Sequence, residues 1–260
     1  MIQTITIIGA GNLATRLGTA LYQAGLQIMQ VYSRTEASAV ALAKQLNCDF
    51  TVEINKICLD ADLLIFAVKD DALEGLLGQL ACNEKLIVHT AGSLPMSVLA
   101  GHSCNYGVFY PLQTFSKQRE ISFKSIPICI EASSPETLAK LKALASLLSN
   151  QVEEINSAQR QSLHLAAVFT CNFVNHFYYL GQQVVEESGV DFNLLKPLIV
   201  ETAAKVMEVL PFDAQTGPAK RFDEAIINKH LKILEQQPEL QEIYSFVSKS
   251  IFEAHKIPNK

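Results

Sequence analysis

Two glycines and an alanine follow the first apolar run, in the segment Ile5-Thr-Ile-Ile-Gly-Ala-Gly-Asn-Leu-Ala14. In a GxGxxA turn the first glycine permits the bend, the second lets backbone N–H groups approach a diphosphate, and the third small residue lets the helix pack closely. The anion then lies at the helix N-terminus. We therefore expect Gly9, Gly11, Asn12 and Leu13 to bind a dinucleotide. The alternative is a tight strand-to-helix turn without a ligand.

The end of the second predicted strand indicates which dinucleotide. An NAD site carries an acidic residue some 20 residues past the turn, whereas an NADP site offers a cation to the 2'-phosphate. Here the strand ends in Val31-Tyr-Ser-Arg-Thr35, without a carboxylate. Ser33, Arg34 and Thr35 are therefore predicted to bind the phosphate of NADP, through hydrogen bonds and charge. The alternative is that Arg34 is a solvated loop residue.

A long apolar helix in the second half of the chain carries a stripe of polar residues. At 100° per residue His164, Cys171 and Asn175 share a narrow arc, with Arg160 beside them and Asn172 at its edge. Buried polar groups need a partner or a ligand. We expect His164 to donate a proton and Asn172 to orient a substrate carbonyl. The alternative is that the stripe forms a contact between helices or between two copies of the chain.

The segment Thr216-Gly-Pro-Ala-Lys-Arg-Phe-Asp223 breaks between two predicted helices. Its Arg221 has a planar guanidinium that matches a carboxylate in a bidentate arrangement. Arg221 is therefore a candidate for binding a substrate carboxylate. The alternative, with equal weight, is a local ion pair between Arg221 and Asp223.

Apolar runs alternate with amphipathic stretches in the first half of the chain, which is typical of parallel βαβ units. The predicted strands are Ile5–Ile8, Gln27–Tyr32, Leu63–Val68, Leu86–His89, Asn105–Phe109, Ile126–Glu131 and Gln151–Ile155. The hydrophobic period changes to 3.6 residues near residue 157. The sequence therefore predicts a doubly wound Rossmann sheet over residues 1–156 and an all-helical domain over residues 157–260.

The bulk composition narrows the classes of function. The chain has 260 residues, of which 49% are hydrophobic and 18% charged, with a formal net charge of -5. Nucleic-acid binding is not expected, because the basic residues are not clustered. Six cysteines are scattered without the spacing of a zinc site, so no metal is expected. With no signal-peptide pattern and no sufficiently apolar span, the protein is expected to be cytoplasmic and not bound to membranes.

Further motifs carry a resemblance to a known family. Ala67-Val-Lys-Asp70 and His89-Thr-Ala-Gly-Ser93 follow two of the predicted strands, and Phe109-Tyr-Pro-Leu-Gln-Thr-Phe115 and His164-Leu-Ala-Ala-Val-Phe-Thr-Cys-Asn172 come later. With the glycine turn, they resemble NADP oxidoreductases related to pyrroline-5-carboxylate reductase, ketopantoate reductase and the coenzyme F420-dependent enzymes. The later motifs resemble the branch that joins a Rossmann-like domain to a DUF2520 domain.

The resemblance implies further roles. Ala67, Val68 and Lys69 would lie beneath the adenosine and diphosphate, and Thr90, Ala91 and Gly92 would lie near the nicotinamide. Tyr110-Pro111 would form a rigid turn that closes the site, where Gln113 and Thr114 could bind substrate. His89 would reach either the site or the core. Dehydrogenase relatives often place a lysine four residues before the helical asparagine, and here that position holds Val168.

The hypothesis is an NADP(H)-dependent oxidoreductase that transfers a hydride to or from a small keto acid or imine bearing a carboxylate. The protein is expected to form a homodimer through its helices. One alternative is a non-catalytic NADP-binding sensor that acts through a protein partner. Another is a reductase of a deazaflavin acceptor.

Overall fold

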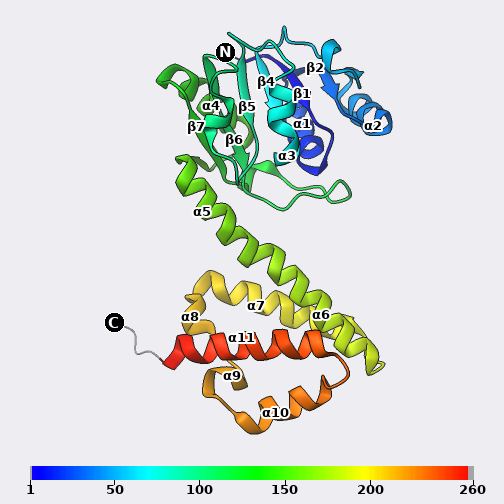
Figure 1. The fold of residues 1–260 in the computed structure, drawn as a ribbon, viewed down its shortest axis with the longest axis vertical. Helices are drawn as coiled ribbons and strands as arrows, with labels where there is room; N and C mark the ends of the chain where they lie inside the picture. Colours follow the sequence, from blue (N-terminus) through cyan, green and yellow to red (C-terminus); the bar gives the residue numbers. More distant parts are fainter. Residues whose placement is uncertain (1, 257–260) are drawn as a thin grey trace. The chain divides into compact units, whose positions relative to one another are not determined.

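The computed structural model describes residues 2–256, and its N-terminal part is built on one sheet (Figure 1). The strand order is β3-β2-β1-β4-β5-β6-β7-β8. All neighbouring strands pair in parallel except β6 and β7, which are antiparallel. The bounds are β1 Thr4–Ile8, β2 Gln27–Tyr32, β3 Asp49–Thr51, β4 Leu63–Phe66, β5 Leu86–His89, β6 Asn105–Pro111, β7 Ile128–Ala132 and β8 Val152–Glu154. The first six strands have the Rossmann order, which confirms the predicted fold class.

Helices cover both faces of the sheet, because both faces are apolar. Ile5 and Ile7 of β1 join one buried cluster, whereas Ile8 joins another, as the alternation of a strand requires. The first cluster includes residues of α1 (Asn12–Gln23), α2 (Glu36–Leu46) and α4 (Pro135–Leu148). The second includes residues of α3 (Asp70–Leu77) and of the 3₁₀ helix η2 (Met96–Leu99). Two further 3₁₀ helices are η1 (Ile54–Lys56) and η3 (Phe123–Ser125).

The strand order reverses between β1 and β4, and three loops meet at the carboxyl ends of the neighbouring strands. Gly9 donates its backbone N–H to the carbonyl of Tyr32 at 2.8 Å, and Ala67 donates to the carbonyl of Ile8 at 2.8 Å. Thr90 donates to the carbonyl of Phe66 at 3.2 Å. These hydrogen bonds extend the pairing between neighbouring strands by one residue. They fix the loops at the crevice where doubly wound sheets bind their ligands.

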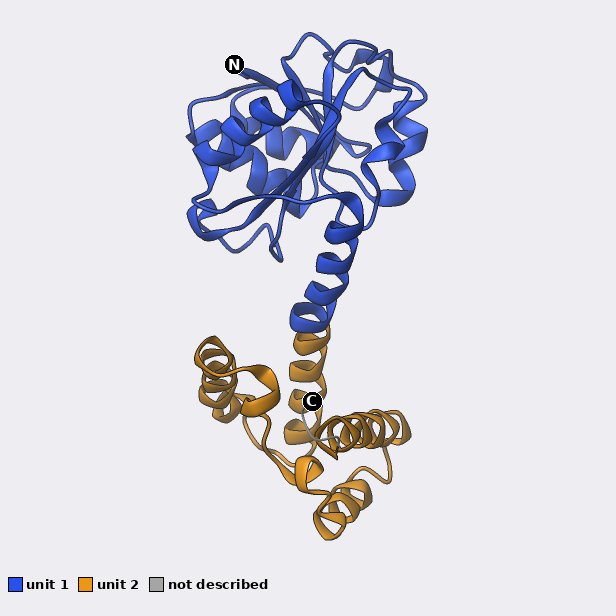
Figure 2. Ribbon diagram, turned by 90° about the vertical axis from the view of Figure 1, so that its left-hand side faces the viewer, with its two compact units in different colours: residues 1–172 blue, residues 173–260 orange. Residues whose placement is uncertain are grey.

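A long run of helix follows β8. It consists of α5 (Ser157–Ala167), the π-helical segment η4 (Val168–Phe173) and α6 (Val174–Glu187). The side chain of Asn156 accepts from the N–H of Gln159 while Gln159 accepts from the N–H of Asn156, each at 2.9 Å, which forms a capping box. The chain divides into compact units of residues 1–172 and 173–260 (Figure 2). The first unit thus includes α5, and the predicted boundary at residue 156 stays a prediction.

The second unit is helical, as predicted. After α6 its elements are η5 (Phe192–Leu195), α7 (Lys196–Glu208), α8 (Pro211–Ala214), α9 (Pro218–Arg221), α10 (Glu224–Ile233) and α11 (Pro238–Lys256). The rings of Phe222 and Phe252 stack at 4.3 Å between centroids. Nδ1 of His230 lies 2.7 Å from the hydroxyl of Tyr244. Contacts of this kind hold α9 and α10 against α11.

Three details of the sheet differ from the sequence-based prediction. The short edge strand β3 was not predicted, since it has only three residues and two of them are exposed. The predicted strand Leu63–Val68 ends at Phe66, where the loop begins. The predicted turn at Tyr110-Pro111 is wrong, because both residues belong to β6 and pair with β7. Pro111 is the last residue of β6, so the donor that it lacks is missing only at the end of the strand.

Within residues 2–256, every helix is too short or too polar to traverse a lipid bilayer.

Candidate functional site

A cavity of about 430 Å³ lies at the carboxyl ends of β1, β2 and β4. Among its lining residues are Gly9, Gly11, Ser33, Arg34, Ser38, Ala67, Val68 and Lys69. Arg34 and Lys69 are cationic, and no acidic side chain lines this cavity. Thr35 is exposed and lies outside the lining. The arrangement gives this end of the site a positive charge.

Gly9 and Gly11 fulfil different requirements. Gly9 has φ +125°, and a Cβ built on it would lie 2.1 Å from the carbonyl oxygen of Ala67. Any side chain at Gly9 would therefore clash with the backbone. A Cβ on Gly11 would meet no protein atom within 4 Å. The fold therefore does not require a small residue at position 11. Because Gly11 has no side chain, the space above the turn stays open.

Helix α1 begins at this turn without a side-chain cap. Its N-cap residue is Gly11, and the first helical bond runs from the N–H of Thr15 to the carbonyl of Gly11 at 2.9 Å. The first amides of a helix have no intrahelical partner, and together with the helix dipole they favour an anion. Open space above Gly11, unpaired amides and nearby cations fit the diphosphate and 2'-phosphate of a dinucleotide.

A second cavity of about 430 Å³ continues from the first, with which it shares Gly11 and residues 67–69. Its walls also include Asn12, Leu13, Asp70, Thr90, Ala91, Gly92, Ser93, Tyr110 and His164. The loop after β5 forms one wall, and the side chain of Ser93 donates to the carboxylate of Asp70. All the predicted cofactor residues except Thr35 thus line these two cavities.

A third cavity of about 620 Å³ shares Tyr110, Gln113, Phe115 and His164 with the second. Its other walls come from the segment after β6 and from α5 and η4, and they include Leu112, Thr114, Leu163, Ala166, Ala167, Thr170, Cys171 and Asn172. His164 and Asn172, predicted separately, therefore line one cavity within the first unit. The three cavities adjoin one another through these shared lining residues, and together they are called the groove below.

Tyr110 and His164 meet where the second and third cavities adjoin. The Tyr110 hydroxyl lies 3.1 Å from Nδ1 of His164, and the two rings are edge to face. Burial raises the pKa of Tyr110 to about 12, so the hydroxyl keeps its proton at neutral pH. A Cβ on Gly92 would lie 2.6 Å from Nδ1 of His164, so only glycine leaves room for this ring. Sequence analysis missed the pair, because nothing in the spacing links residues on a strand and a later helix.

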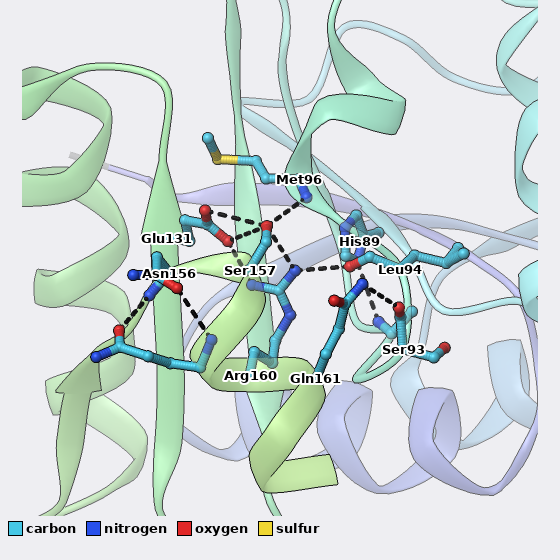
Figure 3. A network of polar contacts seen from close by, with 11 residues as sticks. His89, Ser93, Leu94, Met96, Glu131, Asn156, Ser157, Arg160 and Gln161 are labelled. Carbon is cyan, nitrogen blue, oxygen red and sulfur yellow. Dashed lines mark hydrogen bonds and ion pairs between the residues drawn. The ribbon is translucent and has the colours of Figure 1, made fainter. Parts of the chain in front are cut away.

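A buried ion pair holds α5 in place (Figure 3). The guanidinium of Arg160, which is 1% exposed, donates to the carboxylate of Glu131 on β7 and, at 2.6 Å, to the carbonyl of Leu94. The Ser157 hydroxyl donates to Glu131 at 2.8 Å and accepts from the N–H of Met96 at 2.8 Å. Helix α5 is therefore tied both to the sheet and to the loop after β5.

His89 belongs to the core and does not line any of the three cavities. It is 1% exposed, and its Nδ1 accepts a hydrogen bond from the N–H of Ala91 at 3.1 Å. Burial and, to a smaller extent, the positive charge of Arg160 lower the pKa of His89 to about 4. The imidazole is therefore neutral at physiological pH and supports the loop.

The predicted polar stripe is only partly correct. Arg160 does not face the groove but is buried in its ion pair with Glu131. The assumed 100° per residue also fails across η4, because a π-helix has more residues per turn. Arg221 ends α9 in the second unit and is exposed. Asp223 accepts from the N–H of Ile226 at 3.2 Å and caps α10, and among residues 2–256 no ion pair joins it to Arg221.

Comparison with known proteins identifies the family. Residues 4–92 match the family described as "NADP oxidoreductase coenzyme F420-dependent", and residues 126–251 match "Domain of unknown function (DUF2520)". The chain is 51% identical to the "putative NADP oxidoreductase BF3122" from Bacteroides fragilis, with a TM-score of 0.91 over 97% of this chain and 98% of that chain. The chain belongs to this family of NADP oxidoreductases. It is an enzyme with NADP as its cofactor.

More distant solved structures share the fold. Protein TM1727 from Thermotoga maritima is 21% identical, with a TM-score of 0.80 over 97% of this chain and 100% of that chain. A reductive aminase from Aspergillus terreus, solved with NADPH and ethyl-5-oxohexanoate, is 18% identical, with a TM-score of 0.74 over 97% and 95% of the two chains. No curated protein matches the sequence.

Alanine at the two glycines of the turn is expected to have different effects, on NADPH affinity at Gly11 and on stability at Gly9. Gly11→Ala is expected to leave the melting temperature unchanged and to raise the Kd for NADPH at least tenfold, because the methyl group enters the space above the turn. Gly9→Ala is expected to destabilise the fold by about 1–3 kcal/mol or more. Thermal unfolding and fluorescence titration with NADPH measure both effects. Gly181→Ala, on α6 where a Cβ would meet no atom within 4 Å, is the control for NADPH affinity, and wild-type affinity in Gly11→Ala would contradict the assignment.

Arg160→Met is expected to lower the free energy of unfolding by about 3 kcal/mol, because it leaves Glu131 partly buried without its partner. The double variant Arg160→Met/Glu131→Gln should recover part of this loss, since it removes the unpaired charge. Urea unfolding followed by circular dichroism measures the change. Arg119→Met, at an exposed arginine, serves as control. A free energy within 0.5 kcal/mol of wild type in the single variant would show that the ion pair is dispensable.

Proposed function

We propose that the protein is an NADPH-dependent reductase of a small keto acid or imine that carries a carboxylate. The observation that carries this proposal is the Tyr110–His164 pair, which lies on a groove that begins at the glycine turn. Reduction of a C=O or C=N bond needs a hydride for the carbon and a proton for the oxygen or nitrogen. NADPH supplies the hydride when bound. The residues of the groove bind the cofactor and the substrate and supply the proton.

Each part of the groove has a role in this proposal. The turn at Gly9 and Gly11, with Asn12 and Leu13, binds the diphosphate, and Ser33 and Arg34 bind the 2'-phosphate. Residues 67–69 and 90–92 enclose the rest of the dinucleotide. His164 is the source of the proton that the reduction consumes, and Asn172 orients the carbonyl or imine. Thr35 contributes only by fixing the loop, since its N–H lies 3.4 Å from the hydroxyl oxygen of Ser33.

The proposed substrate follows from charge and from the relatives. In the second unit Arg221 is exposed and its neighbour Asp223 caps α10, so we keep its guanidinium as a candidate for binding a carboxylate. The likeness to a reductive aminase solved with NADPH and a keto ester supports a carbonyl or imine as the reacting group. The family description of residues 4–92 favours a second candidate, the reduction of a deazaflavin such as coenzyme F420.

We also propose that two copies of the chain associate through their second units. Among residues 173–256 only Ala219 and Leu234 are buried apolar residues. Large apolar side chains lie on the surface of α7 and the following segment, where Met207 is 83% exposed and Leu210 is 72% exposed. Monomeric proteins rarely expose apolar surface on this scale. A second copy, which carries the same surface, would cover it by a twofold contact.

A turnover assay with a cofactor variant tests the proposed reductase. Purified enzyme is expected to oxidise NADPH with at least one member of a panel of keto acids, imines and a deazaflavin, as followed by nicotinamide absorbance. Arg34→Ala should raise the Kd for NADPH about 10–100-fold, the effect of losing a charged hydrogen bond, and leave that for NADH nearly unchanged. Arg119→Ala is the matched control. Equal effects on both cofactors would remove Arg34 from the phosphate site, and no turnover with any acceptor would contradict the proposed reaction.

Sedimentation equilibrium tests the association. The wild-type protein is expected to sediment with about twice the monomer mass of 28.6 kDa. Leu198→Glu, which places a charge on the exposed apolar face of α7, should shift the equilibrium toward the monomer. Leu147→Glu, at an exposed leucine of α4 in the first unit, should not. A monomeric wild type at micromolar concentration would contradict the homodimer.

A further inference from the structure

The groove contains one hydroxyl whose position suits it for chemistry. Tyr110 is on β6, close to its carboxyl end, and is 8% exposed. It lines both the cavity that holds the glycine turn and the cavity that reaches Asn172. Because its backbone is part of the sheet, the hydroxyl is fixed more firmly than a group on a loop would be. Its ring packs in a small cluster with Val108 and Cys129.

The other polar groups near this point are engaged elsewhere. The Thr90 hydroxyl faces the carbonyl of Phe66 at 3.4 Å, and the Ser93 hydroxyl donates to Asp70. The side-chain oxygen of Gln113 accepts from the N–H of Thr114 at 2.8 Å. Of the residues that line both cavities, Tyr110 and His164 are the two with titratable side chains.

The surroundings of His164 direct one of its nitrogens at Tyr110. Nδ1 lies 3.1 Å from the hydroxyl, and the buried Gly92 covers the same side of the ring at a distance that would not admit a Cβ. A proton on Nδ1 therefore has the Tyr110 oxygen as its acceptor. When His164 is protonated, Nδ1–H donates to that oxygen, and the Tyr110 O–H is free to point into the groove.

We propose that Tyr110 is a catalytic residue that hands its proton to the substrate heteroatom, while His164 replaces that proton through Nδ1. This inference rests on the proposed reductase function. The hydride forms a bond to the substrate carbon, and the electron pair of the C=O or C=N bond moves to the heteroatom. That atom takes the Tyr110 proton as the Tyr110 oxygen takes the proton of Nδ1. His164 ends neutral, and its Nδ1 takes up a proton from solvent after the product leaves.

The properties of Tyr110 explain why it needs a partner. Burial disfavours its phenolate, so loss of a proton without replacement would be costly. Transfer through a hydrogen-bonded pair avoids a charged phenolate, because the second proton arrives as the first leaves. It follows that neither residue suffices alone. A general acid of this kind contributes roughly 10²–10⁴-fold to a rate.

Turnover of the wild type and three variants on the acceptor found above tests the relay. Tyr110→Phe and His164→Gln are each expected to lower kcat about 100-fold or more, with the Kd for NADPH unchanged. The double variant should be no slower than the slower single variant, because the two residues act as one unit. Tyr106→Phe, on the same strand and outside the groove lining, is the matched control and should retain wild-type kcat.

Nitrogen-15 NMR of labelled histidine gives a readout without turnover. Tyr110→Phe is expected to shift the Nδ1 resonance of His164, identified by its loss in His164→Gln, and Tyr106→Phe is not. An unshifted resonance would overturn the relay. So would near-wild-type kcat in either Tyr110→Phe or His164→Gln, although wild-type turnover would then leave the reductase function intact. A wild type that reduces no acceptor would overturn both proposals.

Discussion

The buried ion pair between Arg160 and Glu131 is the interaction on which the site depends. Removing two charges from water is costly, and the cost is offset only when the remaining hydrogen-bonding positions are filled. Here the Leu94 carbonyl and the Ser157 hydroxyl accept from one terminal nitrogen of Arg160, while its buried Nε has no hydrogen-bond partner among the described residues. One guanidinium thereby connects β7, the loop after β5 and the first turn of α5. Since His164 lies about one helical turn further along α5, its distance from Tyr110 and Gly92 is set by this connection.

The groove divides electrostatically along its length. At one end Arg34 and Lys69 line a cavity without a carboxylate, beside the N-terminus of α1. Toward the other end the lining of the third cavity has no lysine, arginine or acidic residue, and its polar groups are hydroxyls, amides, a thiol and His164. The cationic end suits phosphates, which bind by charge. The neutral end suits proton transfer, because burial there keeps Tyr110 in its protonated form.

How much could be predicted from the sequence depended on how local each requirement is. The bend at Gly9 and the missing acid near Arg34 are local, so pattern and chemistry sufficed for the Rossmann fold and for residues that line the cofactor cavities. The Tyr110–His164 contact spans 54 residues and exists only because α5 is anchored to β7. Arg160 was misjudged for the same reason, since a buried charge partner on another element leaves no periodic signal. The short strand β3 is set by its pairing with β2 and not by its own apolar pattern.

The π-helical segment η4 is another feature that the local sequence does not explain. It contains no glycine or proline, so no local breaker explains it. Segments of this type are rare in proteins and are frequent at functional sites. With more residues per turn, η4 presents Thr170, Cys171 and Asn172 together on the wall that α5 continues through Ala166 and Ala167. In a regular α-helix three consecutive residues point in directions 100° apart, so these three side chains would be spread more widely around the helix. The widened turn therefore shapes the far end of the groove, and the regular helix before it holds His164 at the junction.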